Sequence, residues 1–262
     1  MSTAELEACL SRLYASADYL AAFNREPHLI KSDYQLTETE YERVTGIDRR
    51  RLRLFGSLVV EKRIEKLGRG LSRSHSRLAD DFSRYVRRYI ALRLEPPDDP
   101  PWLDLIHCGD FLSACLRCEG DAPSADLADL EASLLWARYE APALDLALVE
   151  PAAGVVLRGS AWRLRTMTAA IVDVVQARPT SSSQDSSGET IGVLFARHLR
   201  NQLPQLVRCE PFALEVAQVL SARQATPLAD LRSELASTAG LDEVLGDFRL
   251  RGLIRYQAVP GV

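Results

Sequence analysis

The chain has 262 residues, a formal net charge of −4, 47% hydrophobic residues and 26% charged residues. This globular composition suffices for one large domain or two ordinary ones, and it excludes a disordered chain, a collagen-like repeat and a disulfide-stapled miniprotein. No uncharged run is long enough to cross a bilayer, and Met1–Glu5 forms neither a basic nor an apolar stretch. We therefore expect no membrane association, no signal peptide and a cytoplasmic protein with reduced cysteines.

Positive charge is concentrated in one segment. Residues 43–93 hold 15 Arg and Lys against 5 Asp and Glu, a net charge of +10, so the rest of the chain sums to −14. A basic segment in an acidic protein attracts an anionic partner, such as a nucleic acid, an acidic peptide or an acidic protein face. The alternative is that the segment pairs with acidic residues of its own fold.

The first half of the chain is predicted to be helical. A helix start is expected at Thr37, whose hydroxyl would cap the helix while Glu40 reaches back and Leu36 packs on Tyr41. A longer helix is expected to begin near Asp48. Its apolar side is expected to hold Leu52, Phe55, Val59 and Ile64.

The other helices of this half follow from apolar residues at helical spacing. Their expected ranges are about 6–17, 76–94, 102–118 and 124–139. A Pro-rich break at 95–101 separates the second of these from the third.

After Pro142 the pattern changes to short strands and short helices. Strands are expected at 155–157, 161–165, 189–199 and 205–209. The last two flank Asn201-Gln202, and this arrangement predicts a β-hairpin. A flexible Ser-rich loop is expected at 180–188.

Three short helices and a last strand complete the predicted elements. The helices are expected to begin at Pro211, at Thr226-Pro227 and at Leu241, and the strand covers 253–256. Strands, three helices and a closing strand are typical of a winged-helix-like unit.

We therefore expect an α+β fold that is mostly α, in two domains. Residues 1–142 would form a helical domain. Residues 143–262 would form a winged-helix-like domain with a small antiparallel sheet.

Sequence motifs for catalysis are absent. The chain has no Gly-x-Ser-x-Gly, no phosphate-cradling loop and no dinucleotide-binding fingerprint. The four histidines lie far apart in the sequence: His28, His75, His107 and His198. We therefore expect no catalytic residue and no metal ligand in this chain, and no enzyme activity of the chain on its own.

The cysteines offer one alternative. Cys108, Cys115 and Cys118 share a helical face, with His107 beside them. A zinc site needs four ligands, and a redox Cys-x-x-Cys pair usually begins a helix instead of lying within one. The simpler interpretation is that these are small apolar core residues.

The charge of the winged-helix-like region favours a peptide over DNA as the ligand. Residues 205–258 hold 6 Arg against 7 Asp and Glu, and Asp242, Glu243 and Asp247 lie on the third helix. Phosphates would meet these carboxylates where a recognition helix reads bases. A neutral unit of this kind suits an extended peptide that adds to a sheet edge beside a helix.

Several stretches resemble a known family. They are Leu10–Phe23, Tyr34–Glu40, Ile47–Phe55, Val60–Arg63, Pro100–Leu103 and Leu127–Leu134. Together they are similar to the helical part of partner proteins that accompany multinuclear non-heme iron-dependent oxidative enzymes. The last third resembles the RiPP-recognition-element domain of those partners. The best-known pathways of this kind make methanobactin and 3-thiaglutamate-type products, and the N-terminal module looks closer to the second.

The resemblance implies a non-catalytic subunit of a heteromeric enzyme. Such partners hold a ribosomal precursor peptide and dock on a TIM-barrel iron enzyme, which oxidatively remodels a cysteine of the peptide. The iron belongs to the enzyme, so no cofactor is expected in this chain. The alternative is a nucleic-acid-binding regulatory protein that uses residues 43–93.

The resemblance also implies where the peptide lies, between a strand and the third helix. In this sequence the corresponding residues are Leu206, Val207, Arg208, Cys209, Val244, Asp247, Phe248 and Arg251. From the basic segment we assign contacts with the partner enzyme to Arg49, Arg50 and Arg53.

Overall fold

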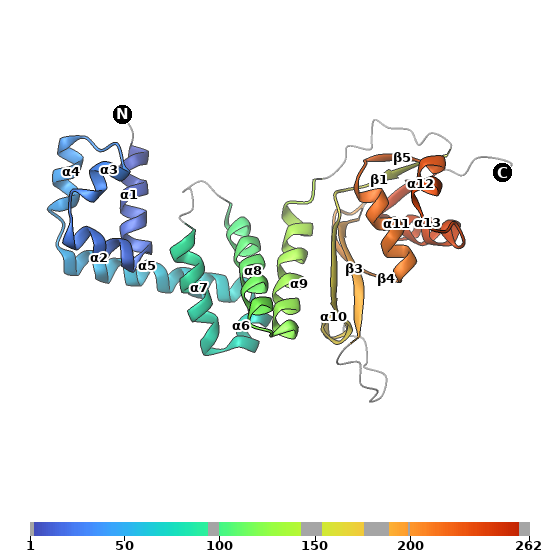
Figure 1. The fold of residues 1–262 in the computed structure, drawn as a ribbon, viewed down its shortest axis with the longest axis horizontal. Coiled ribbons are helices and arrows are strands. Elements are labelled where there is room, and N and C mark those ends of the chain that lie inside the picture. Colours follow the sequence, from blue (N-terminus) through green and yellow to red (C-terminus); the bar gives the residue numbers. More distant parts are fainter. Residues whose placement is uncertain (1–2, 94–99, 143–153, 176–188, 199, 257–262) are drawn as a thin grey trace. The chain divides into compact units, whose positions relative to one another are not determined.

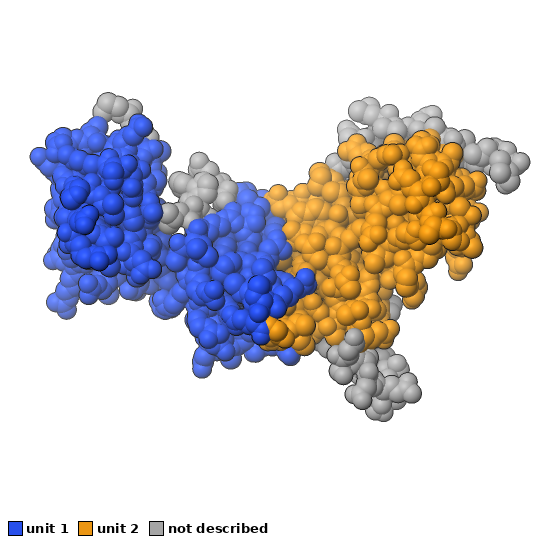
Figure 2. Space-filling model, viewed as in Figure 1, with its two compact units in different colours: residues 1–119 blue, residues 120–262 orange. Residues whose placement is uncertain are grey.

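The structure is a computed structural model that describes residues 3–93, 100–142, 154–175, 189–198 and 200–256. The chain divides into two compact units, residues 1–119 and 120–262 (Figure 2). The expected break at 95–101 lies mostly outside the described residues, and the Ser-rich loop at 180–188 lies wholly outside them. None of the described helices combines the length and the apolar character that a bilayer crossing requires.

The described part of the first unit is built from helices (Figure 1). They are α1 (Thr3–Ala15), α2 (Ala17–Arg25), α3 (Leu29–Asp33), α4 (Glu38–Thr45), α5 (Arg49–Gly70), α6 (Ser72–Leu78), α7 (Asp80–Leu92) and α8 (Pro101–Cys118). The helix expected over 76–94 is interrupted at Ala79, which has a φ of 46°. Asp80 and Asp81 then occupy the first turn of α7, where carboxylates stabilise a new helix start.

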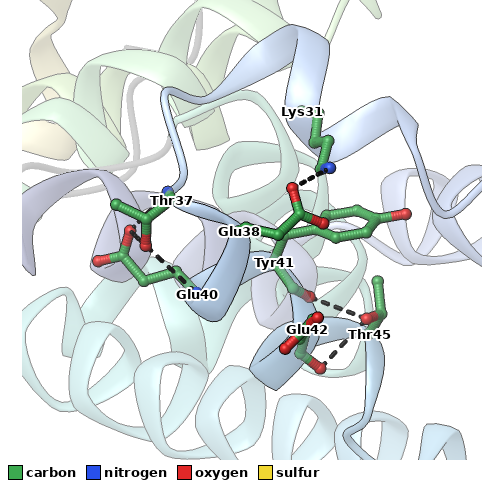
Figure 3. A network of polar contacts seen from close by, with 7 residues as sticks. All are labelled: Lys31, Thr37, Glu38, Glu40, Tyr41, Glu42 and Thr45. Atoms are coloured by element: carbon green, nitrogen blue, oxygen red, sulfur yellow. Dashed lines mark hydrogen bonds and ion pairs between the residues drawn. The ribbon is translucent and has the colours of Figure 1, made fainter.

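The predicted cap at Thr37 is confirmed (Figure 3). The Thr37 hydroxyl accepts a bond from the Glu40 N–H at 3.3 Å, and the Glu40 carboxylate accepts one from the Thr37 N–H at 2.8 Å. The Thr37 N–H and the Thr37 hydroxyl both donate to the Glu40 carboxylate, and these two bonds favour its charged form and lower its pKa. Leu36 and Tyr41 both pack against the same apolar core, as the staple requires.

The side that α5 buries differs from the expected one. Asp48 caps the helix, and Leu52 and Ile64 are buried as predicted, but Phe55 is 52% exposed and Val59 is 39% exposed. The reason is the close approach of α1, which takes the side of α5 centred on Gly56. A Cβ atom at Gly56 would lie 2.8 Å from the Tyr14 carbonyl oxygen.

We expect Gly56→Ala to lower the free energy of unfolding by about 1–3 kcal/mol because the methyl group has no room against backbone. This loss should outweigh the gain in helix propensity, which is about 1 kcal/mol. Gly246→Ala in a C-terminal helix is the control, since a Cβ there meets nothing within 4 Å. Chemical denaturation of the two variants should give opposite signs; equal signs would contradict the packing argument.

The second unit combines helices with two small antiparallel sheets (Figure 1). Its elements are α9 (Ala122–Tyr139), β1 (Val155–Arg158), β2 (Arg163–Thr168), α10 (Ala169–Val175), β3 (Thr190–Arg197), β4 (Pro204–Cys209), α11 (Pro211–Ser221), β5 (Ala225–Pro227), α12 (Leu228–Glu234), α13 (Leu241–Leu250) and β6 (Ile254–Tyr256). The strand orders are β5-β1-β6 and β2-β3-β4. The expected class, α+β and mostly α, is confirmed, as is the predicted hairpin of β3 and β4.

Both faces of the central strand β3 are covered. Val193 and Phe195 pack in a core with Leu130 of α9, whereas Leu194 and Ala196 pack in a core shared with α11, α12 and α13. The division expected at residue 142 therefore differs from the boundary at Glu119 and Gly120, because α9 packs on the sheet.

Candidate peptide-binding site

A groove of about 590 Å³ lies where the end of β4, the start of α11 and α13 meet. Apolar side chains of Phe212, Val244 and Phe248 contribute to its lining. Its charged residues are of both signs: Arg208, Arg251, Glu210, Glu243 and Asp247. A groove with apolar and charged walls suits a ligand that buries one side chain and keeps polar atoms at the rim.

The strand beside this groove is an edge strand. In the described residues β4 pairs only with β3, through a register that sets Val207 opposite Leu194 and Arg208 opposite Val193. Its other side therefore carries backbone donors and acceptors that no described strand pairs with. An extended peptide can take these groups by adding as a further strand.

Five of the eight residues assigned to the peptide line this groove. They are Arg208, Val244, Asp247, Phe248 and Arg251. Three of them lie on α13 and Arg251 follows directly as its C-cap; they come together because offsets of three, four and seven residues lie on one helical face. Phe248 is almost fully buried, so it supports the groove more than it forms an open contact.

The other three assigned residues do not line the groove. Val207 and Cys209 are buried in the core with α11 and α13, and Leu206 packs against the core beneath α9. The alternation of β4 sends its side chains to two covered faces of the sheet. In this stretch Arg208 is the side chain that lines the groove, and the backbone of β4 is the other part that a peptide can contact.

The first turn of α11 is the part of the groove that sequence reasoning missed. It contributes Phe212 and Ala213, and Gly240 and Glu243 add to the wall from the start of α13. Pro211 marks the helix start directly after β4. That signal places the first turn of α11 beside the end of the strand.

Two ion pairs hold the arginines of the groove. Arg208 donates to Asp173 of α10, with an Nη1–Oδ1 distance of 2.5 Å, and Arg251 donates to Asp247, with an Nε–Oδ2 distance of 2.7 Å. Burial raises the pKa of the neighbouring Cys209 thiol to about 11, which favours its protonated form.

The three arginines assigned to the enzyme partner have different environments. Arg49 lies over the Phe23 ring at 3.9 Å and is half-buried, and this burial lowers its pKa. Arg50 is exposed beside the cap at Asp48. Arg53 lines a separate groove formed with α1 and α2.

An exposed apolar row on α5 was not anticipated as a surface. It consists of Leu54, Phe55, Leu58 and Val59, and we call it the α5 surface. Helical spacing puts exposed Arg51 and Lys62 on the same side of the helix. Exposed Glu65 lies on this side as well, so the α5 surface is an apolar row flanked by charges of both signs.

The cysteine alternative finds no support in the geometry. Cys108 is fully buried and Cys118 is exposed, so the two do not face one common site. Burial raises the pKa of Cys115. Within the described residues no three His, Cys, Asp or Glu side chains are grouped so that they could hold a metal ion.

Comparison with known proteins assigns no family. No protein-family model matches this sequence, and no curated protein is similar to it at a significant level.

Proposed function

We propose that this chain is a non-catalytic partner subunit that binds a ribosomal precursor peptide and presents its cysteine to an iron-dependent oxidative enzyme. The observation that carries the proposal is the groove of about 590 Å³ at the edge of β4 with which no described strand pairs. It combines a strand edge with apolar residues of a flanking helix, which is what an extended peptide requires.

The order of elements supports a winged-helix-like recognition domain. The sheet β2-β3-β4 is followed by α11, α12 and α13, and β6 closes the series. The groove lies between β4 and α13, where the family resemblance expects the peptide. The resemblance, the strand edge and the groove therefore point to the same ligand.

Both the backbone and the side chains of the peptide would contribute to its binding. Main-chain hydrogen bonds to β4 would supply affinity without regard to sequence, and one apolar peptide side chain would rest on Val244 and Phe212. The charged residues at the rim of the groove would select the peptide residues next to that apolar side chain. The oxidation itself would take place on iron held by the enzyme, while this chain holds the peptide in one orientation.

The α5 surface is the part of the helical unit that we assign to the enzyme. Leu58 is 53% exposed and Leu54 is 63% exposed, and solvent exposure of apolar residues on one helix face marks an interface. Arg50 and Arg53, with Arg51 and Lys62, would attract an acidic face of the enzyme.

Affinity purification of the tagged full chain from its native host tests the proposal. We expect an iron-containing protein and a small cysteine-bearing peptide to co-elute, as measured by mass spectrometry and metal analysis. A Leu54→Asp/Leu58→Asp variant should lose the iron protein and keep the peptide. Recovery of the chain alone, or with nucleic acid in place of both partners, would contradict the proposal.

A further inference from the structure

A second groove, of about 690 Å³, lies in the same unit between the β3–β4 turn, the end of α13 and β6. Cationic and donor residues from three parts of the sequence line it: His198, Arg200, Arg249 and Arg255. No Asp or Glu is among the described residues that line it. We call it the cationic groove.

Two of these cations are available to a ligand. Arg200 and Arg249 are exposed, and neither forms an ion pair with another residue in the described part of the chain. Guanidinium groups bind carboxylates through two parallel hydrogen bonds, which makes such a pair directional as well as charged.

The His198 ring is held in place at the wall of the groove. Its Nδ1 accepts from the backbone N–H groups of Arg200 at 3.1 Å and Asn201 at 3.4 Å. The Nε2 end of the ring packs against Gly252, where a Cβ atom would lie 2.6 Å from Nε2, so the position requires glycine. These contacts fix the start of the turn that carries Arg200.

The two grooves lie at opposite ends of β4. Arg208, near the end of the strand, lines the first groove, and Arg200, in the turn before the strand, lines the cationic groove. β4 is six residues long, which corresponds to about 20 Å of extended chain. The two grooves also adjoin at the end of α13, where Arg251 lines the first groove and Gly252 lines the cationic groove. One extended peptide paired with β4 can therefore reach both grooves.

We propose that the cationic groove binds an Asp or Glu side chain of the same precursor peptide whose apolar side chain lies in the first groove. The inference rests on the proposed function and extends it to the ligand's sequence. Strand addition alone leaves the register open to slippage, and an anchor at each end of the strand removes that freedom.

Charge also sets the direction of the peptide. The first groove has Glu210, Glu243 and Asp247 in its lining, and these repel an acidic residue. The cationic groove attracts it, so the acidic end of the peptide lies at the β3–β4 turn. A nucleic acid fits less well, since Asp242 and Glu243 are exposed on the first turn of α13.

Selection from a displayed library of random twelve-residue peptides against the full chain tests this inference. We expect the enriched peptides to carry Asp or Glu at one fixed spacing from an apolar residue. Replacing that Glu by Gln in a synthetic copy should weaken binding about tenfold at low salt, in line with a pair of guanidinium contacts.

The matching variants assign the effect to the groove. In the variant Arg200→Gln/Arg249→Gln, changing the peptide's Glu to Gln should not weaken binding any further. Arg232 is an exposed arginine outside both grooves, so Arg232→Gln should bind the peptide as the wild type does. Enriched peptides without an acidic residue, or an equal Glu-to-Gln effect in wild type and variant, would overturn the inference.

The outcomes separate the two proposals. If peptides without acidic residues bind and depend on Val244, the cationic groove fails and the proposed function stands. If no peptide is enriched, both fail. Binding of a DNA oligonucleotide that is lost in Arg200→Gln/Arg249→Gln would overturn the inference, because phosphate would then be the anion bound.

Discussion

Val244→Asp is expected to weaken the binding of library-selected peptides at least about a hundredfold, because it places an unpaired carboxylate against an apolar ligand side chain. Val244 is half-buried and lines the groove between Glu243 and Asp247. The new carboxylate would therefore be repelled by two neighbours as well as desolvated by the peptide. Fluorescence anisotropy with a labelled, selected peptide measures the change directly.

The control for this prediction is another half-buried valine of the same core. Val219 on α11 packs partly against the cluster that contains Phe248, but it lines neither described groove of this unit. Val219→Asp should cost similar stability and leave peptide affinity within about twofold, as for sites without shared contacts. Equal loss in the two variants would show that unfolding, not the groove, accounts for the effect.

Local chemistry made part of the fold predictable. The cap at Thr37 involves residues three apart, and the hairpin of β3 and β4 follows from alternation around a short turn. Both depend on neighbours in sequence, so a single sequence contains the necessary information. On α13 the family resemblance supplied the assignment of Val244 and Asp247, and helical spacing accounts for their common face.

The features of the fold that were not predicted depend on contacts between residues that lie far apart in the sequence. Packing of α9 on the sheet set the unit boundary, and the approach of α1 to Gly56 turned Phe55 and Val59 outward. On β4 the side chains of Val207 and Cys209 went into the core because a helix covers that face. No periodicity in the local sequence reveals which partner will cover a face.

The cationic groove could not be predicted from the sequence for the same reason. His198 and Arg200 come from one turn, Arg249 from the end of α13, and Arg255 from β6. Their spacing in the sequence has no motif. Charge counted over residues 205–258 even indicates balance, and only the fold separates the acidic start of α13 from the basic groove at its other end.

A buried charge in the helical unit should have the largest effect on stability. Asp104 of α8 is 3% exposed and accepts two hydrogen bonds from Arg63 of α5, at 2.7 and 3.0 Å, and one from the Tyr89 hydroxyl of α7, at 2.8 Å. The three bonds join three helices at one carboxylate. Burial and the nearby Asp104 charge raise the pKa of Tyr89, so its hydroxyl stays a donor.

We expect Asp104→Ala to lower the free energy of unfolding by about 3–5 kcal/mol, since it leaves a partly buried guanidinium and a buried hydroxyl without their shared acceptor. Denaturant unfolding of the full chain, followed by helical circular dichroism, measures this loss.

Glu65→Ala is the control, because it removes an exposed i,i+4 pair with Arg69 and should cost less than about 0.5 kcal/mol. Arg63→Met together with Asp104→Leu should recover part of the stability, because apolar groups leave no buried charge uncompensated. If Asp104→Ala unfolds within 1 kcal/mol of the wild type (about the error of such an extrapolation), the carboxylate does not hold the three helices together.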